Sequence, residues 1–315
     1  MALAVSVHDA SVAYGKNKAL SNCSIEVEQG IVFGLLGPNG AGKSTLMKAI
    51  SGQLALSSGT VELFGRDLFY NLAPLKEMLG IVPQDYSFAH DFTVEENLRF
   101  IARLYGLSGK NLEKKIEGQL ADYFLAPKRS CVAGTLSGGY KRLLNFALST
   151  MHEPKLLLLD EPTVGLDPDM RETVWGMVRS MRKKGMTMVL TTHYLEEATS
   201  LCDRIAIIFK GSILVLGNPS DIIEQYGGNT TIFLNLSASP AGVVSEVGRI
   251  RGVVSCEARG DVLVCSCANK EVVRVMAAVN EIIKREDLAV NAAYVQEATL
   301  DDAFKSIVAR QEGVA

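Results

Sequence analysis

The stretch Gly37-Pro-Asn-Gly-Ala-Gly-Lys-Ser-Thr45 fits the pattern G-x-x-x-x-G-K-[ST] and lies between an apolar run and a segment with helical periodicity. Its glycines allow backbone N–H groups to curl around an anion, and the N-terminus of the following helix adds partial positive charge. A lysine here can reach terminal phosphates, and the next hydroxyl can bind Mg²⁺. A glycine-rich turn is the alternative, but the context predicts nucleotide binding. The predicted binding residues are Gly37, Pro38, Asn39, Gly40, Ala41, Gly42, Lys43, Ser44 and Thr45.

Short apolar runs alternate with longer amphipathic stretches around this loop. This alternation predicts buried parallel strands connected by helices, and therefore an α/β fold. The expected strands are 31–37, 79–83, 155–161, 186–193 and 204–211. Two earlier segments, 5–15 and 21–30, alternate in the manner of antiparallel strands. Between about 85 and 150 the pattern becomes helical, which predicts an inserted helical subdomain.

The composition changes after residue 220, and the pair Gly227-Gly228 with Asn229 indicates a linker. The chain length of 315 residues favours one large domain with a smaller one. We therefore expect a nucleotide-binding domain over 1–220 and an accessory α+β domain over 229–315. In the latter, the strands 231–237 and 261–267 and helices over about 270–285 and 298–310 are the clearest elements.

Charge and hydropathy exclude several classes of protein. The net charge of −3 provides no attraction to nucleic acid, so no nucleic-acid partner is expected. The longest uncharged stretch, 225–245, is broken by Gly, Asn, Thr, Ser and Pro, and it does not predict a membrane-spanning helix. The first residues lack a basic region before an apolar segment, so no secretory signal is expected. These features together predict a cytoplasmic protein.

Six cysteines are scattered along the chain without CxxC spacing, which indicates reduced, buried thiols and not a disulfide framework. Cys265 and Cys267 lie two residues apart, so they would share one face of a strand. A metal site would need more ligands than their neighbourhood offers, and core packing is the favoured interpretation.

A second part of the nucleotide site follows the strand 155–161. Its four leucines end in Asp160 and Glu161, at the strand edge where ligands gather in parallel sheets. Asp160 could hold a metal ion through water, and Glu161 could orient or deprotonate an attacking water. His193 follows the strand 186–193 and should lie at the same edge, near the terminal phosphate. We therefore predict Glu161, His193 and Lys43 as catalytic residues.

Ser137, Gly138 and Gly139 precede another helical segment, and they form a second candidate anion site. Simple helix capping is the alternative. One phosphate is not easily held by two loops that the chain keeps apart, so this loop is expected to serve a neighbouring subunit.

These motifs, in this order over about residues 3–220, resemble the ATP-binding cassette (ABC) family, specifically the ATPase subunit of a transporter. The resemblance identifies 37–45 with the Walker A loop, 136–140 with the signature, 156–162 with Walker B and 164–167 with the D-loop. Tyr14 resembles the adenine-stacking aromatic, although packing on a strand would equally explain it. Gln84 resembles the Q-loop residue, a further Mg²⁺ ligand. Tyr140 departs from the family, which usually has Gln at this signature position.

The resemblance implies that two ATPase subunits, identical or different, sandwich two ATP molecules with Mg²⁺. It also implies separate multi-spanning transmembrane subunits, one of which would insert a short helix near 88–99, and a peripheral position on the cytoplasmic face. The C-terminal domain looks like those of exporters of drugs, lipids or polysaccharides, although a dimer-stabilising module is equally consistent. The rival function is a soluble ABC-type ATPase acting on nucleic acid or ribosomes. A single cassette without a basic face favours the transporter.

Overall fold

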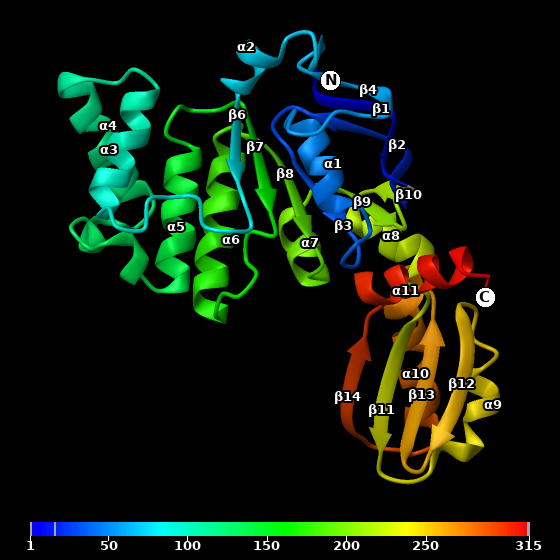
Figure 1. Ribbon diagram of the computed structural model, residues 1–315. Coiled ribbons are helices and arrows are strands. Elements are labelled where there is room, and N and C mark those ends of the chain that lie inside the picture. Colours follow the sequence, from blue (N-terminus) through cyan, green and yellow to red (C-terminus); the bar gives the residue numbers. More distant parts are fainter. Residues whose placement is uncertain (1, 16, 314–315) are drawn as a thin grey trace. The chain divides into compact units, whose positions relative to one another are not determined.

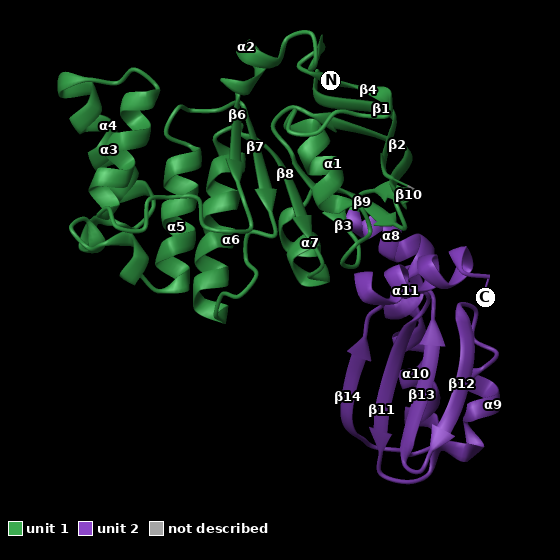
Figure 2. Ribbon diagram, in the orientation of Figure 1, with its two compact units in different colours: residues 1–218 green, residues 219–315 purple. Residues whose placement is uncertain are grey.

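The computed structural model describes residues 2–15 and 17–313, and the chain divides into two compact units, 1–218 and 219–315 (Figures 1 and 2). The division falls immediately before helix α8 (Pro219–Tyr226). This helix packs against α11 (Leu300–Gln311) near the end of the chain, so it belongs to the second unit. The linker glycines Gly227 and Gly228 therefore lie inside the second unit and not before it.

The first unit is built on a six-stranded sheet in the order β10-β9-β3-β8-β7-β6, in which β10 alone is antiparallel to its neighbour within the described residues. The expected α/β fold and its five parallel strands are confirmed. Their apolar runs are buried because helices cover the sheet. The strands are β3 (Val32–Leu36), β6 (Leu79–Val82), β7 (Leu156–Asp160), β8 (Thr187–Thr192), β9 (Arg204–Phe209) and β10 (Ser212–Gly217).

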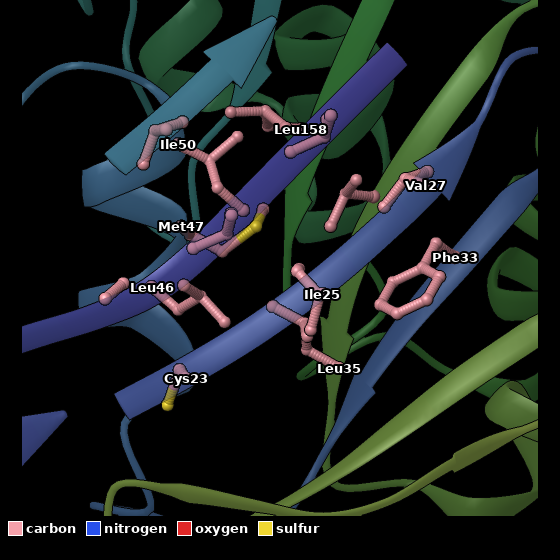
Figure 3. Packing of buried hydrophobic residues seen from close by; sticks show 14 of the residues in the cluster. Cys23, Ile25, Val27, Phe33, Leu35, Leu46, Met47, Ile50 and Leu158 are labelled. Carbon is pink, nitrogen blue, oxygen red and sulfur yellow. The ribbon is translucent and has the colours of Figure 1, made fainter. Parts of the chain in front are cut away.

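A second, antiparallel sheet in the order β2-β1-β4-β5 lies over one face of the first sheet, with helix α1 (Lys43–Ile50) between them. The expected antiparallel pair at the N-terminus is confirmed. Figure 3 shows the resulting core: Ile25 and Val27 of β2, Phe33 of β3, Met47 of α1 and Leu158 of β7 point into the same space. The strands are β1 (Leu3–Tyr14), β2 (Asn17–Glu28), β4 (Ser58–Leu63) and β5 (Arg66–Asp67).

Helices interrupt the strand series between β6 and β7, where the sequence predicts a helical subdomain (Figure 1). They are α3 (Val94–Leu104), α4 (Gly109–Asp122) and α5 (Gly138–Ser149). Helix α3 begins at a capping box, in which the Thr93 hydroxyl accepts from the Glu96 amide and the Glu96 carboxylate accepts from the Thr93 amide. The unit is completed by α2 (Leu72–Lys76), α6 (Pro168–Lys183) and α7 (Leu195–Leu201).

The second unit contains a four-stranded antiparallel sheet in the order β12-β13-β11-β14 with helices α9 (Val244–Val247) and α10 (Val272–Arg285). Buried residues of β11, β13 and α10 form its separate core. The strands are β11 (Thr230–Leu236), β12 (Val253–Arg259), β13 (Val262–Cys267) and β14 (Val290–Gln296). The sequence analysis did not predict β12 and β14, because β14 is exposed along its whole length and β12 lacks a continuous apolar alternation.

Across residues 2–15 and 17–313, none of the helices combines the length and the apolar character needed to cross a bilayer.

The core of the first unit predicts a specific loss of stability. Phe33 is fully buried in β3, so Phe33→Ala should leave a cavity and lower the free energy of unfolding by about 3–5 kcal/mol. Tyr70→Ala removes an aromatic side chain that is 90% exposed, so it should change the free energy of unfolding by less than about 0.5 kcal/mol. Trp175, the one tryptophan of the chain, is buried in the first unit, so its fluorescence during urea unfolding reports this unit. Equal effects of both substitutions would contradict the packing described here.

Candidate functional site

The loop between β3 and α1 has a conformation that requires glycine at two positions. Gly42 precedes α1 with φ of +112°, and a Cβ there would lie 2.8 Å from the Ala19 carbonyl oxygen. A Cβ at Gly37 would overlap the carbonyl oxygen of Ile208 in β9. The loop is therefore packed closely on its neighbours. The first-turn N–H groups of α1 lack partners within the helix, which makes the start of this helix suited to an anion.

Lys43 is held in place by protein atoms of the loop and of the segment after β7. Its side chain is only 5% exposed, and Nζ donates hydrogen bonds to the carbonyl oxygens of Gly37 (2.7 Å) and Pro38 (3.1 Å). Its ion-pair partner is Glu161, whose Oε1 lies 3.7 Å from Nζ. Burial lowers the pKa of Lys43 because the charged form loses its hydration, while Glu161 and Asp160 act in the opposite direction. A phosphate at this position would add a further counter-charge.

Asp160 and Glu161 both contact residues at the start of α1, although successive residues of a strand point to opposite faces. Asp160 Oδ1 lies 3.5 Å from the Ser44 hydroxyl, while Glu161 faces Lys43. Glu161 makes this possible by leaving the strand conformation, since its φ is +47°. A positive φ is strained for a residue with a Cβ, and it concentrates at functional sites. The strand end predicted from the sequence thus places two carboxylates beside the phosphate loop.

Thr191 of β8 stabilises this strained turn, a contact that the sequence analysis missed. Its hydroxyl donates to Asp160 Oδ1 (2.6 Å) and accepts from the Glu161 amide (3.0 Å). His193, two residues later, lies with Nδ1 3.1 Å from Glu161 Oε1. Glu161 Oε1 therefore lies between the Lys43 ammonium and the His193 ring. The signal for Thr191 is its polar hydroxyl in a fully buried strand, although Thr187 and Thr192 of β8 carry the same signal.

A cleft of about 560 Å³ opens at this edge of the sheet. It brings together many of the predicted residues, namely Asn39, Gly40, Gly42, Lys43, Ser44, Thr45, Gln84 and Glu161. Gly37, Pro38 and Ala41 belong to the same loop but are not part of the lining. Asp160 and His193 reach the cleft through Ser44 and Glu161 respectively.

Tyr14, the predicted adenine-stacking residue, lies at the end of β1 and is 54% exposed. It is described by the structure but is not part of the cleft lining. Its strand partner Asn17 does line the cleft, together with Lys18 and Ala19. On the other side, Lys210 and Gly211 contribute as well, since the Gly211 amide donates to the Ala41 carbonyl. The sequence analysis missed these five residues, because only the folded chain brings the two segments to the loop. The available signal was two lysines, Lys18 near the start of β2 and Lys210 in the turn after β9.

Ser137, Gly138 and Gly139 lie at the start of α5, and none of the three lines the cleft although the structure describes them all. Ser137 occupies the N-cap position, but its hydroxyl makes no capping hydrogen bond. Ser137 and Gly138 are exposed, whereas a Cβ at Gly139 would collide with Met170. Tyr140, the departure from the family pattern, packs its ring under the Lys128 ammonium (5.4 Å). The loop is therefore free to meet a ligand outside its own cleft.

Helix α5 also holds the segment that contains Gln84. The Arg142 guanidinium is 3% exposed and donates to the carbonyl oxygens of Pro83 (2.8 Å) and Gln84 (2.9 Å). Burial lowers the pKa of Arg142. The Asn145 side chain donates to the Asp85 carbonyl oxygen and accepts from the backbone amide of Ser87. Sequence reasoning missed both residues, since neither lies in a recognised motif.

Tyr86 completes this contact between loop and helix. Its hydroxyl donates to the Gly138 carbonyl oxygen at 3.3 Å, and the cationic groups of Lys141 and Arg142 lie over its ring. The Gln84 segment and the Ser137 loop are thus joined to the same helix by hydrogen bonds.

A buried carboxylate connects the segments after β7 and β8. Glu197 of α7 is 1% exposed, and its Oε1 accepts from the Thr163 hydroxyl (2.8 Å) and the Trp175 indole (3.2 Å). Burial raises the pKa of Glu197. Beyond Thr163, Asp167 caps α6 by accepting from the Met170 amide. Glu197 therefore positions the turn between Glu161 and α6.

A glycine loop, a lysine, a hydroxyl and two carboxylates at the carboxyl edge of a parallel sheet define a P-loop nucleotide-binding protein. A family model described as ABC transporter matches residues 20–164, which contain the loop, the signature and Walker B.

Known proteins of similar sequence and structure agree with this assignment. The linearmycin resistance ATP-binding protein LnrL of Bacillus subtilis is 40% identical over 225 residues, which are 71% of this chain and 72% of that protein. The Nod factor export ATP-binding protein I of Rhizobium etli is 36% identical over 272 residues, 86% and 85% of the two chains. The structure of CbiO1 from Clostridium perfringens, part of the transporter complex CbiONQ, has a TM-score of 0.66 at 28% identity over 70% of this chain and 91% of that one.

The chain belongs to the ABC transporter family, in which it is an ATP-binding and ATP-hydrolysing subunit. The transporter function is thereby favoured over a soluble ATPase acting on nucleic acid or ribosomes.

Removal of the Lys43 ammonium tests the phosphate loop. Lys43→Ala should weaken ATP binding by about 2–5 kcal/mol, roughly 30-fold or more, because a buried charge partner of the phosphates is lost. Lys48→Ala, on the exposed side of the same helix, should leave the affinity unchanged. Isothermal titration calorimetry measures both. Equal affinities would contradict the placement of phosphates at Lys43.

Loss of the Arg142 hydrogen bonds should loosen the Gln84 segment. In Arg142→Met, two carbonyl oxygens lose a charged donor, so we expect the free energy of unfolding to fall by about 2–4 kcal/mol. Hydrogen exchange of peptides covering 83–87 should become faster. Lys141→Met, which removes a neighbouring cation without a hydrogen bond to this segment, is the matched control. Unchanged exchange in Arg142→Met would show that the segment is held by other contacts.

Proposed function

We propose that two copies of this fold close on two ATP molecules, each bound between the Lys43 loop of one copy and the Ser137 loop of the other. The second copy is either this chain or a related ATPase subunit. The observation that carries the proposal is the separation of the two loops: the Lys43 loop lines the cleft, while the exposed Ser137 loop with its uncapped hydroxyl does not. Hydrolysis would remove the shared ligand and reopen the pair.

Mg²⁺ would be held by the Ser44 hydroxyl, by Asp160 through water and by Gln84. Two features support this. The Ser44 and Asp160 oxygens are 3.5 Å apart, close enough to share one small cation directly or through water, and Gln84 lines the same cleft. When bound, Mg²⁺ would neutralise charge on the terminal phosphates. Hydroxyl, carboxylate and amide oxygens are the ligand types that this ion prefers.

Glu161 would orient and deprotonate the attacking water. Its Oε1 has a partner on two sides, Lys43 at 3.7 Å and His193 at 3.1 Å, and both partners lie beside the phosphate loop. Lys43 would exchange its carbonyl partners for phosphate oxygens. His193 would contact the terminal phosphate and hold Glu161 in the orientation needed for in-line attack. Asn17, Lys18 and Lys210 would face the base and ribose side of the cleft.

The closing motion would be passed to separate multi-spanning transmembrane subunits on the cytoplasmic face of the membrane. A groove of about 460 Å³ between α3, α5 and β6 supports a docking position beside the expected segment 88–99. Leu104 and Tyr105 line it and are exposed, as is Phe100 nearby on α3. The named relatives confer linearmycin resistance and export Nod factor, which supports export as the direction of transport for this chain. The cargo would be a drug, a lipid or a polysaccharide.

Blocking hydrolysis should trap the closed pair. Glu161→Gln keeps the size of the side chain but removes the base, so the variant should bind ATP, lose at least 100-fold in turnover and double in mass with ATP and Mg²⁺. Sedimentation velocity measures the mass. Addition of Ser137→Arg to this variant should prevent the doubling, because the new side chain fills the space of the shared phosphate.

The outcomes separate the two parts of the proposal. A Glu161→Gln chain that hydrolyses ATP normally would contradict the role of Glu161. One that binds ATP but stays monomeric would contradict pairing with a second copy of this chain, and one that pairs equally well with Ser137→Arg would contradict the shared nucleotide. Circular dichroism of each variant confirms that it is folded.

A further inference from the structure

Two thiols face each other across neighbouring strands of the second unit. Cys256 of β12 is the register partner of Cys265 of β13, and their sulfur atoms are 3.2 Å apart. Directly opposed residues of an antiparallel pair have Cα separations of about 4.5–5.5 Å, within the range that a disulfide spans. The sequence places Cys265 and Cys267 on one strand face, but only the register of β12 adds Cys256.

The two thiols differ in access. Cys256 is partly exposed, at the margin of the core of the second unit, whereas Cys265 is fully buried. The hydrogen bond between them lowers the pKa of Cys256 and raises that of Cys265. Cys256 is therefore the thiol that a small oxidant meets first and the better nucleophile of the two.

Three other cysteines, Cys23, Cys202 and Cys267, lack this arrangement. Cys23 donates to the Gly211 carbonyl oxygen, and Cys202 is buried against Gly34, so each packs as a small apolar residue in the first unit. Burial raises the pKa of both. Cys267 lies two residues beyond Cys265, and its register partner on β12 is Val253.

We propose that Cys256 and Cys265 form an oxidative modification site, which peroxide converts to a disulfide between β12 and β13. The Cys256 thiolate attacks one peroxide oxygen, the O–O bond breaks, and a sulfenic acid and hydroxide form. Cys265 gives its proton to the hydroxide and attacks the sulfenic sulfur, which releases a second hydroxide. Two thiols and one hydrogen peroxide thus yield one disulfide and two waters. A dithiol reductant reverses the reaction by exchange.

The disulfide would link the edge strand β12 covalently to β13. Strand β12 ends the sheet and pairs only with β13 among the described residues. The disulfide would close a short loop through the turn at Gly260, adjacent to the existing hydrogen-bonded ladder. Oxidation should therefore occur without rearrangement of the sheet, and it should protect β12 against local opening.

The test is peroxide treatment of the reduced full-length chain, followed by maleimide labelling and peptide mass analysis. We expect loss of two thiols, a cross-linked peptide pair containing Cys256 and Cys265 that is lighter by two hydrogens, and recovery with dithiothreitol. Hydrogen exchange of β12 should slow in the oxidised chain. The wild-type result does not depend on the folding of any variant.

Three variants complete the experiment. Cys256→Ser and Cys265→Ser should each abolish the cross-link, whereas the matched control Cys267→Ser should retain it. Three results would overturn the proposal. Cys256 could reach the sulfinic state without pairing, Cys267 could replace either partner in the cross-link, or both thiols could stay reduced. None of these results bears on ATP-dependent pairing, because the site and its readout lie in the second unit.

Discussion

A lysine ammonium buried beside a glycine loop is the constraint on which the first unit depends. Lys43 is 5% exposed, and the protein compensates its charge with two loop carbonyls and the Glu161 carboxylate. Around it, neighbouring backbone leaves no room for side chains at Gly37 and Gly42, and Glu161, the residue after β7, has a left-handed conformation. The compensation is incomplete, since burial still lowers the pKa of Lys43. In the proposed complex, the nucleotide phosphates would supply the remaining counter-charge.

Helix α5 links the segment around Gln84 to the loop at Ser137 and to the groove beside Tyr105. Its first residues form the exposed Ser137 loop, while Arg142 and Asn145, one and two turns later, bind the backbone around Gln84. In the proposed pair, a displacement of Gln84 at one nucleotide would move the helix whose N-terminus contacts the other nucleotide. The same helix lines the groove beside Tyr105, so a membrane subunit docked there would be mechanically coupled to both ATP sites.

Local patterns in the sequence predicted the parts of this structure that local physics determines. The phosphate loop, the parallel strands and the antiparallel pair at the N-terminus follow from glycine spacing and apolar periodicity, and all are confirmed by the fold. Contacts made across the fold could not be predicted in this way. Lys18 and Lys210 line the same cleft only because distant segments pack together. For the same reason, Arg142 donates a hydrogen bond to the Gln84 carbonyl oxygen. Strand β14 is exposed along its whole length, and it forms because β11 offers it an edge.

The most direct test of the account is a structure of the Glu161→Gln chain bound to ATP and Mg²⁺. The account predicts a pair of chains in which each terminal phosphate contacts Lys43 of one copy and lies within hydrogen-bond distance of Ser137 of the other. A nucleotide bound at Lys43 with no Ser137 opposite it, or an empty Lys43 pocket under saturating ATP, would contradict it.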